Sequence, residues 1–189
     1  NDAKHGWFTE WPRIQDIGED KLLMDMHGLF FKFPKTFAAW NSAGIEPIGN
    51  HIRYIPDFCE WNGQLVLATD ESSIQGNPMT GQPQSNLWFG DFADLKTCGP
   101  RNAAGSIYMK DAVKAGVPSE PFLMNGFPRR VVHLAADRPV TFKLEIDREG
   151  NGSFVDYQHI KVDGYAHHIF AQDLEAQWIR VSADQDCQA

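Results

Sequence analysis

The sequence predicts an all-β protein built from antiparallel sheets, and three observations lead to this prediction. Residues 140–147 alternate apolar and polar side chains, and Phe142, Leu144 and Ile146 fall on one face, which is the period of a half-buried strand. The 16 Gly and 11 Pro residues provide for many turns. No segment carries an apolar 3.6-residue period over three turns, so we expect helix in under about a fifth of the chain.

A β-hairpin is the clearest single element that the sequence predicts. After the strand described above, a Gly-Asn-Gly turn is followed by more apolar alternation, so residues 139–163 are predicted to fold as one hairpin. Its outer face should leave Lys143 and Glu145 exposed. Two further strands are expected, over residues 165–170 and 177–182.

A weak internal repeat indicates propeller blades. Residues 21–33 and 64–92 share a turn, a Leu-rich strand and an aromatic strand, with Leu22 and Leu65 separated by 43 positions, and residues 130–146 are a candidate third copy. Periods of about 40–50 residues with several strands in each unit are typical of β-propellers. The alternative is that any β protein produces two similar Leu-rich strands by chance.

Three such units are too few to close a propeller, which typically has about 4–8 blades. We therefore expect an incomplete segment of a larger β-propeller, completed by the remainder of a longer chain or by a second copy in a homo-oligomer. The expected domain organisation is blade-like β repeats with long loops over residues 1–120. A C-terminal antiparallel part rich in β-hairpins follows over residues 121–189.

Composition argues against two classes of partner. The chain has 189 residues with 17 basic and 25 acidic side chains, for a net charge of −8, and Arg129-Arg130 is its one adjacent basic pair. Nucleic acid is therefore not expected, since phosphate binding needs clustered Lys and Arg. No apolar run approaches the ~20 residues of a membrane span. Cys59 and Cys98 either form a disulfide, if the protein is exported, or remain free thiols with Cys187.

The segment 49–57 is the first candidate for chemistry. On a strand, His51 and Arg53 would share one face, which puts a proton-transfer group beside an anion-binding group. In sugar-acid chemistry, an Arg neutralises a carboxylate or sulfate while a His or Tyr, here His51 or Tyr54, moves a proton. The alternative interpretation is an ordinary edge strand with polar residues facing outward.

Asp70 is a further catalytic candidate. It is followed by Glu71, and paired carboxylates serve as acid and base in glycoside hydrolysis. Adjacent strand residues point to opposite faces, so one of the two would need Asp57 or Asp25 as its partner. The alternative is a polar strand end without chemistry.

Substrate binding is predicted for a long loop and two tryptophans. Residues 71–86 are rich in amides, and Gln75 and Gln84 offer planar donors and acceptors that match sugar hydroxyls. Trp61 and Trp88 could supply the apolar platform on which a sugar ring stacks. The same composition also occurs in β-turns close to a core Trp.

No metal or other cofactor is predicted. Residues 147–152 match the beginning of a calcium loop, but Gln158 stands where a bidentate carboxylate is needed, so a hairpin turn is favoured. His167 and His168 adjoin in the sequence and would face opposite ways on a strand, which does not make a chelate between them. Motifs for nucleotide, zinc-ribbon, metalloprotease and α/β-hydrolase chemistry do not occur.

The segments 54–63 (YIPDFCEWNG) and 82–90 (QPQSNLWFG) carry a family resemblance. The stretch 51–90 resembles β-propeller-like proteins of bacterial polysaccharide-degradation systems, and residues 122–187 resemble their C-terminal β-rich part. The resemblance implies a secreted or periplasmic protein with a role on glycans. It supplies no catalytic motif that transfers to particular residues.

These observations predict a carbohydrate-binding or carbohydrate-processing protein that acts on polysaccharide, including acidic polysaccharide. The bound sugar is expected close to His51, Arg53 and Trp88. If the protein is an enzyme, a glycoside hydrolase or a polysaccharide lyase is expected. The alternative is a non-catalytic structural or interaction module. A polar pocket that joins His51 to the loop 71–86 would favour the first interpretation.

Overall fold

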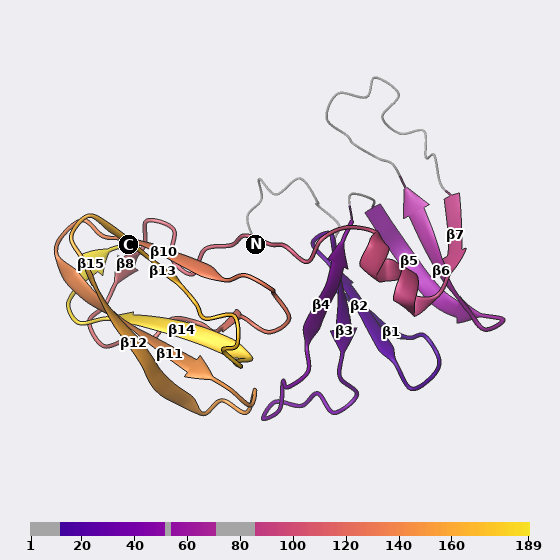
Figure 1. Ribbon diagram of the computed structural model, residues 1–189, viewed down its shortest axis with the longest axis horizontal. Coiled ribbons are helices and arrows are strands. Elements are labelled where there is room, and N and C mark those ends of the chain that lie inside the picture. Colours follow the sequence, from indigo (N-terminus) through magenta and orange to yellow (C-terminus); the bar gives the residue numbers. More distant parts are fainter. Residues whose placement is uncertain (1–11, 52–53, 71–85) are drawn as a thin grey trace, which may run out of the picture. The chain divides into compact units, whose positions relative to one another are not determined.

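The computed structural model describes residues 12–51, 54–70 and 86–189 (Figure 1). Within these residues the fold is all-β and its sheets are antiparallel, which confirms the predicted class. The helical structure that it contains is one short 3₁₀ helix, η1 (Phe92–Thr97). The chain divides into two compact units. The first comprises the residues up to Lys35 together with Ile45–Asn102, and the second comprises Thr36–Gly44 and Ala103–Ala189.

The first unit contains a four-stranded meander. Its strands are β1 (Arg13–Asp16), β2 (Leu22–Met26), β3 (Leu29–Phe33) and β4 (Glu46–Asn50), and they pair in sequence order. Three consecutive residues of β2, Leu23 to Asp25, and two of β3, Phe30 and Phe31, are buried, so the inner strands lack the alternation of a half-buried strand.

A three-stranded meander completes the first unit. It consists of β5 (Tyr54–Trp61), β6 (Gln64–Asp70) and β7 (Asn86–Gly90), again paired in sequence order. Both sheets use a two-residue turn with positive φ at each position, His27-Gly28 between β2 and β3 and Asn62-Gly63 between β5 and β6. Turns of this kind match the right-handed twist of the strands that they join.

One hydrophobic core joins the two meanders. It contains Leu23 and Phe30 from the first sheet, Phe58 and Leu67 from the second, and Leu95 from η1. Leu95 is fully buried. The 3₁₀ helix is thus held in place by the same apolar contacts that pack the sheets together.

The second unit is organised around strand β11 (Val140–Asp147). Its main sheet has the order β12-β11-β14-β9, with β12 (Phe154–Val162), β14 (Trp178–Ala183) and β9 (Phe122–Leu123). β10 (Val131–Ala135) pairs with β13 (Tyr165–Ile169), and β8 (Ala112–Val113) pairs with β15 (Cys187–Gln188). Strands β10 and β11 therefore belong to different sheets, and the candidate third repeat over residues 130–146 is not a blade.

The predicted hairpin over residues 139–163 is confirmed as β11 and β12. Phe142, Leu144 and Ile146 are at most 1% exposed, as the alternation predicts. The prediction for Glu145 is wrong, since this residue is buried. The Arg180 guanidinium on β14 donates two hydrogen bonds of 3.1 Å to the Glu145 carboxylate and lies over the Phe154 ring, so the outer face of β11 is covered at Glu145.

The turn of the hairpin is held by one buried carboxylate. Asp147 accepts hydrogen bonds from the backbone N–H groups of Glu149, Gly150 and Gly152, at 3.1, 2.9 and 2.8 Å. An aspartate that bonds the backbone of the residues after it is a common turn device. The segment that matches a calcium loop is accordingly a hairpin turn.

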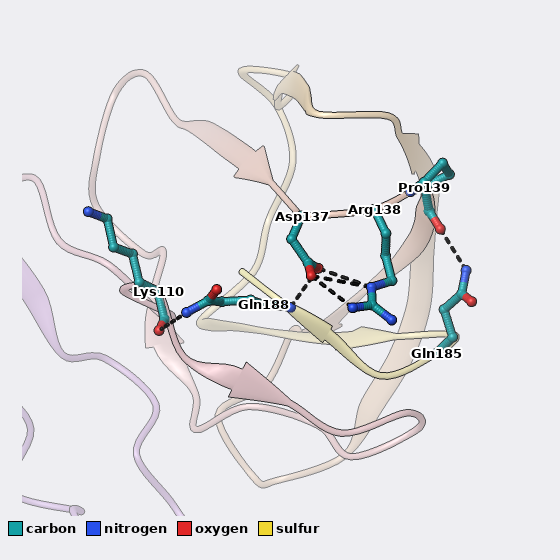
Figure 2. Close-up of polar contacts among 6 residues, drawn as sticks. All are labelled: Lys110, Asp137, Arg138, Pro139, Gln185 and Gln188. Carbon is teal, nitrogen blue, oxygen red and sulfur yellow. Dashed lines mark hydrogen bonds and ion pairs between the residues drawn. The ribbon is translucent and has the colours of Figure 1, made fainter.

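The C-terminal strand β15 is fastened by polar contacts (Figure 2). Asp137 accepts a 2.9 Å hydrogen bond from the backbone N–H of Gln188 and is also ion-paired with Arg138. The Gln188 side chain donates to the Lys110 carbonyl, and Gln185 donates to the Pro139 carbonyl. These bonds satisfy polar groups that a two-residue strand could not satisfy alone.

The structure places the boundary between the units at residue 102, where the sequence suggested 120. Residues after 102 join the second unit because Ser119 and Tyr108 bond the backbone of Val181. Residues 36–44 also belong to it, through Ser42 and its bonds to Gly150. All three cysteines are free thiols.

Replacement of Phe142 by Ala is expected to lower the free energy of unfolding by about 3–5 kcal/mol, because it leaves a cavity in the core of the second unit. Urea denaturation measures the change. Val155→Ala on β12 is the control, since Val155 is 50% exposed and should change little. An equal effect of the two substitutions would contradict the face assignment.

Glu145 should make stability dependent on acid pH. Burial opposes its ionisation, but hydrogen bonds from Arg180 and Lys143 outweigh that cost and lower the pKa of Glu145. Its contribution is therefore complete above the unfolded-chain pKa of about 4.3 and is lost as the pH falls through the lower folded-state pKa. Thermal melts of Glu145→Gln should show a smaller loss of stability in that range than the parent protein. Glu175→Gln, at an exposed position, should behave as the parent.

Candidate functional site

Three of the sequence-predicted site residues, Arg53, Gln75 and Gln84, lie outside the described residues. The backbones of Tyr54 and Asp70 are described, and their side chains are not. These two residues are directly opposite one another where β5 pairs with β6. The sheet register thus brings two of the predicted catalytic positions together across neighbouring strands.

His51 lies in a different environment from the expected one. Strand β4 ends at Asn50 and β5 begins at Tyr54 in another sheet, so His51 is located between strands. Its side chain is 5% exposed and its Nε2 lies 2.9 Å from a carboxylate oxygen of Asp25, itself 1% exposed. The Phe30 ring is 4.4 Å away, centre to centre. The imidazole is therefore part of the interior, not of an outward strand face.

The two predicted platform tryptophans do not act together. Trp61, at the end of β5, is 61% exposed, and its ring lies edge-on to that of Phe89 at 6.2 Å. Trp88 packs against the core of the first unit, since neighbouring residues of β7 alternate in direction. Trp61 is thus available for stacking on a sugar ring, with Phe89 rather than Trp88 beside it.

The first unit contains a cleft of about 840 Å³, here called the cationic cleft. It is lined by residues from β2, β3 and β4 and by η1 with the segment that follows it. The lining residues are Asp20, Lys21, Leu22, Lys32, Phe33, Pro34, Lys35, Glu46, Pro47, Ile48, Phe92, Lys96, Gly99, Pro100 and Arg101. Five of them are cationic and two are acidic, although the chain as a whole has a net charge of −8.

Close backbone packing fixes the two sides of the cationic cleft. A Cβ at Gly49 would lie 2.8 Å from the carbonyl oxygens of Leu95 and Gly99, so β4 approaches η1 as closely as glycine allows. A Cβ at Gly99 would meet the Asn50 side chain at 1.9 Å. These close contacts hold η1, which carries Lys96, and the segment after it, which carries Arg101, next to β4.

The cations of the cleft differ in their partners. Lys35 is held by Asp16 and Asp20 at 2.9 Å each, Arg101 by Glu46 at 3.4 Å, and Lys21 by Glu19. The hydrogen bonds that the Lys35 ammonium donates to the Asp20 and Asp16 carboxylates raise the pKa of Lys35, so it stays protonated. Lys32 and Lys96 make no ion pair with any residue that the structure describes. Their charges remain available to an anionic ligand.

An aromatic component accompanies these charges. The Phe33 and Phe92 side chains line the cationic cleft, and the Lys21 ammonium lies 5.6 Å from the centre of the Phe92 ring. Cations with flat apolar surface suit a ligand that has both negative groups and apolar ring faces. Sequence reasoning missed this site, since its cations are spread over positions 21–101 and no two are adjacent.

The described residues contain no group of three or more His, Cys, Asp or Glu side chains that could hold a metal ion. They also contain no helix with the length and apolar character needed to cross a membrane. Comparison with protein-family models, curated proteins and solved structures finds no match for this chain.

The Asp25–His51 pair should contribute to stability. Either single substitution, Asp25→Ala or His51→Ala, is expected to cost at least about 1–3 kcal/mol, because the partner is left buried without its bond. Urea denaturation of both variants and of the double variant measures the coupling. The double variant should lose less than the sum of the two, and strict additivity would contradict a direct interaction.

Proposed function

We propose that this protein binds an anionic polysaccharide, with carboxylate or sulfate groups held in the cationic cleft. The single observation that carries the proposal is the concentration of Lys21, Lys32, Lys35, Lys96 and Arg101 around one cleft of an acidic chain. A cleft in which one sign of charge predominates raises the local concentration of oppositely charged ligand and speeds its capture. Arg101 adds a planar fork that matches a carboxylate or sulfate group.

Aromatic surface supports a sugar as the carrier of that charge. Phe33 and Phe92 line the cationic cleft. Sugar rings present apolar C–H faces that pack on aromatic side chains. A small inorganic anion would have no use for these surfaces.

Binding is better supported than turnover. The interior position of His51 does not offer its imidazole to a polymer at the surface. If the protein also cleaves its ligand, as a glycoside hydrolase or polysaccharide lyase, Tyr54 and Asp70 are the candidates, since they are cross-strand partners. The proposed setting, which rests on the family resemblance, is a secreted or periplasmic protein of polysaccharide degradation.

The proposed architecture is a pair of neighbouring blades from a larger β-propeller. Two meanders with similar tight turns share one core, as blades do. The three-stranded meander of β5, β6 and β7 carries Trp61, Leu87 and Phe89 on one face, and their exposed fractions are 61%, 62% and 46%. An apolar sheet face is the surface on which a further blade would pack, and it equally favours the second candidate function, an interaction module.

Dextran, carboxymethyl dextran and dextran sulfate test the proposal, since they share a backbone and differ in charge. The protein should bind both charged polymers and not dextran, with an affinity that falls as salt is added. Lys32→Gln with Lys96→Gln should weaken binding by about tenfold or more, since a charge-assisted contact contributes about 1.5–3 kcal/mol. Isothermal titration on the same samples as the thermal melts separates binding from folding.

The matched control is the double variant Lys110→Gln and Lys161→Gln, which changes the net charge equally at exposed positions of the second unit. It should bind as the parent does. Equal losses in both double variants would mean that net charge, not the cationic cleft, governs binding. A single-stranded oligonucleotide is included as a polyphosphate. Binding of the oligonucleotide as tight as that of the charged dextrans would contradict a carbohydrate ligand.

A further inference from the structure

The two-stranded ribbon of β10 and β13 presents two imidazoles side by side. His133 and His167 are direct partners in the antiparallel register, and both are exposed. Side chains at directly opposite positions of such a pair have Cβ atoms about 4.5–5.5 Å apart and extend from the same face. This juxtaposition involves His167 with a cross-strand residue, not with its sequence neighbour His168.

The distance between the rings is close to that required for a shared ligand. Their centroids are 6.3 Å apart and their planes are inclined by 31°. A tetrahedral ion with nitrogen ligands at about 2.0–2.1 Å would bring the two centroids to about 5 Å. The required approach of about 1 Å is a small side-chain rotation for two exposed residues.

A third residue orients one of the rings. The Tyr165 hydroxyl lies 2.6 Å from Nδ1 of His133, and the Tyr165 ring stacks with both imidazoles at centroid distances of 6.1 and 6.3 Å. When Nδ1–H donates to the hydroxyl oxygen, the lone pair of the neutral ring is on Nε2. A hydrogen bond at the far nitrogen is the usual way in which proteins set a metal-binding imidazole.

We propose that His133 and His167 form a bidentate site for a divalent transition metal ion, with Tyr165 as the residue that positions His133. Imidazole suits Cu²⁺, Ni²⁺ and Zn²⁺, and Cu²⁺ binds most tightly in the general order of stability. Two protein ligands leave the remaining coordination positions to water or to an external ligand. The site lies in the second unit and is independent of the cationic cleft.

Titration of the full chain without an affinity tag tests the site, with Cu²⁺, Ni²⁺ and Zn²⁺ as separate probes. One Cu²⁺ per chain should bind at this site, and the electron paramagnetic resonance spectrum should show coupling to two nitrogens. His133→Ala and His167→Ala should each lower the affinity for Cu²⁺. This loss should be at least the roughly 10–100-fold that removal of an outer-shell partner causes. Tyr165→Phe should fall within that range while keeping both nitrogens in the spectrum.

His159→Ala is the matched control, because His159 is an exposed strand histidine whose cross-strand partner is Lys143. It should bind Cu²⁺ as the parent does. Thermal melts without metal establish that each variant is folded, and addition of Cu²⁺ should raise the melting temperature of the parent and of His159→Ala more than that of the other variants. Unchanged affinity in a folded His133→Ala/His167→Ala double variant, or an equal loss in His159→Ala, would overturn the proposal.

Discussion

Carboxylates that leave water must be bonded elsewhere, and in this protein three of them tie the strands together. Asp25, Glu145 and Asp147 are each at most 6% exposed although they lie within strands. An unpartnered buried charge is too costly to persist, so the partner of each is effectively specified. Asp25 holds the residue after β4, Glu145 bonds β11 to β14, and Asp147 closes the turn between β11 and β12.

The features that the sequence predicted correctly depend on residues that are close together in the chain. The class of fold and the β11–β12 hairpin follow from alternation and from turn residues, which act between neighbours in the sequence. The burial of Glu145 was not predicted, because Arg180, which covers it, lies 35 residues later in the chain. The periodicity of one strand contains no information on side chains that another strand places over it. The interior position of His51 was not predicted for the same reason, since its partner Asp25 lies in an apolar strand 26 residues earlier. That isolated carboxylate in β2 was the one available signal.

The candidate site shows the same limit more strongly. Trp61 was identified from its residue type, whereas the cationic cleft draws its charges from segments far apart in the chain. Net charge is a sum over the whole sequence, and a binding surface depends on where the charges are located. An acidic chain can therefore hold a basic cleft. The spacing of cations along the sequence and their spacing in the folded chain are therefore separate properties.

The segment Thr36–Gly44 makes the second unit discontinuous in sequence. Ser42 accepts a hydrogen bond of 2.7 Å from the Trp178 indole, and Gly44 donates one of 3.0 Å to the buried Gln177. A fragment that begins at residue 103 would lack Ser42 and Gly44, so the Trp178 indole and the Gln177 side chain would lose these hydrogen bonds. A single cut in the chain therefore cannot separate the two units without loss of contacts. The second unit has to be produced from two segments, residues 36–44 and 103–189, that associate with each other.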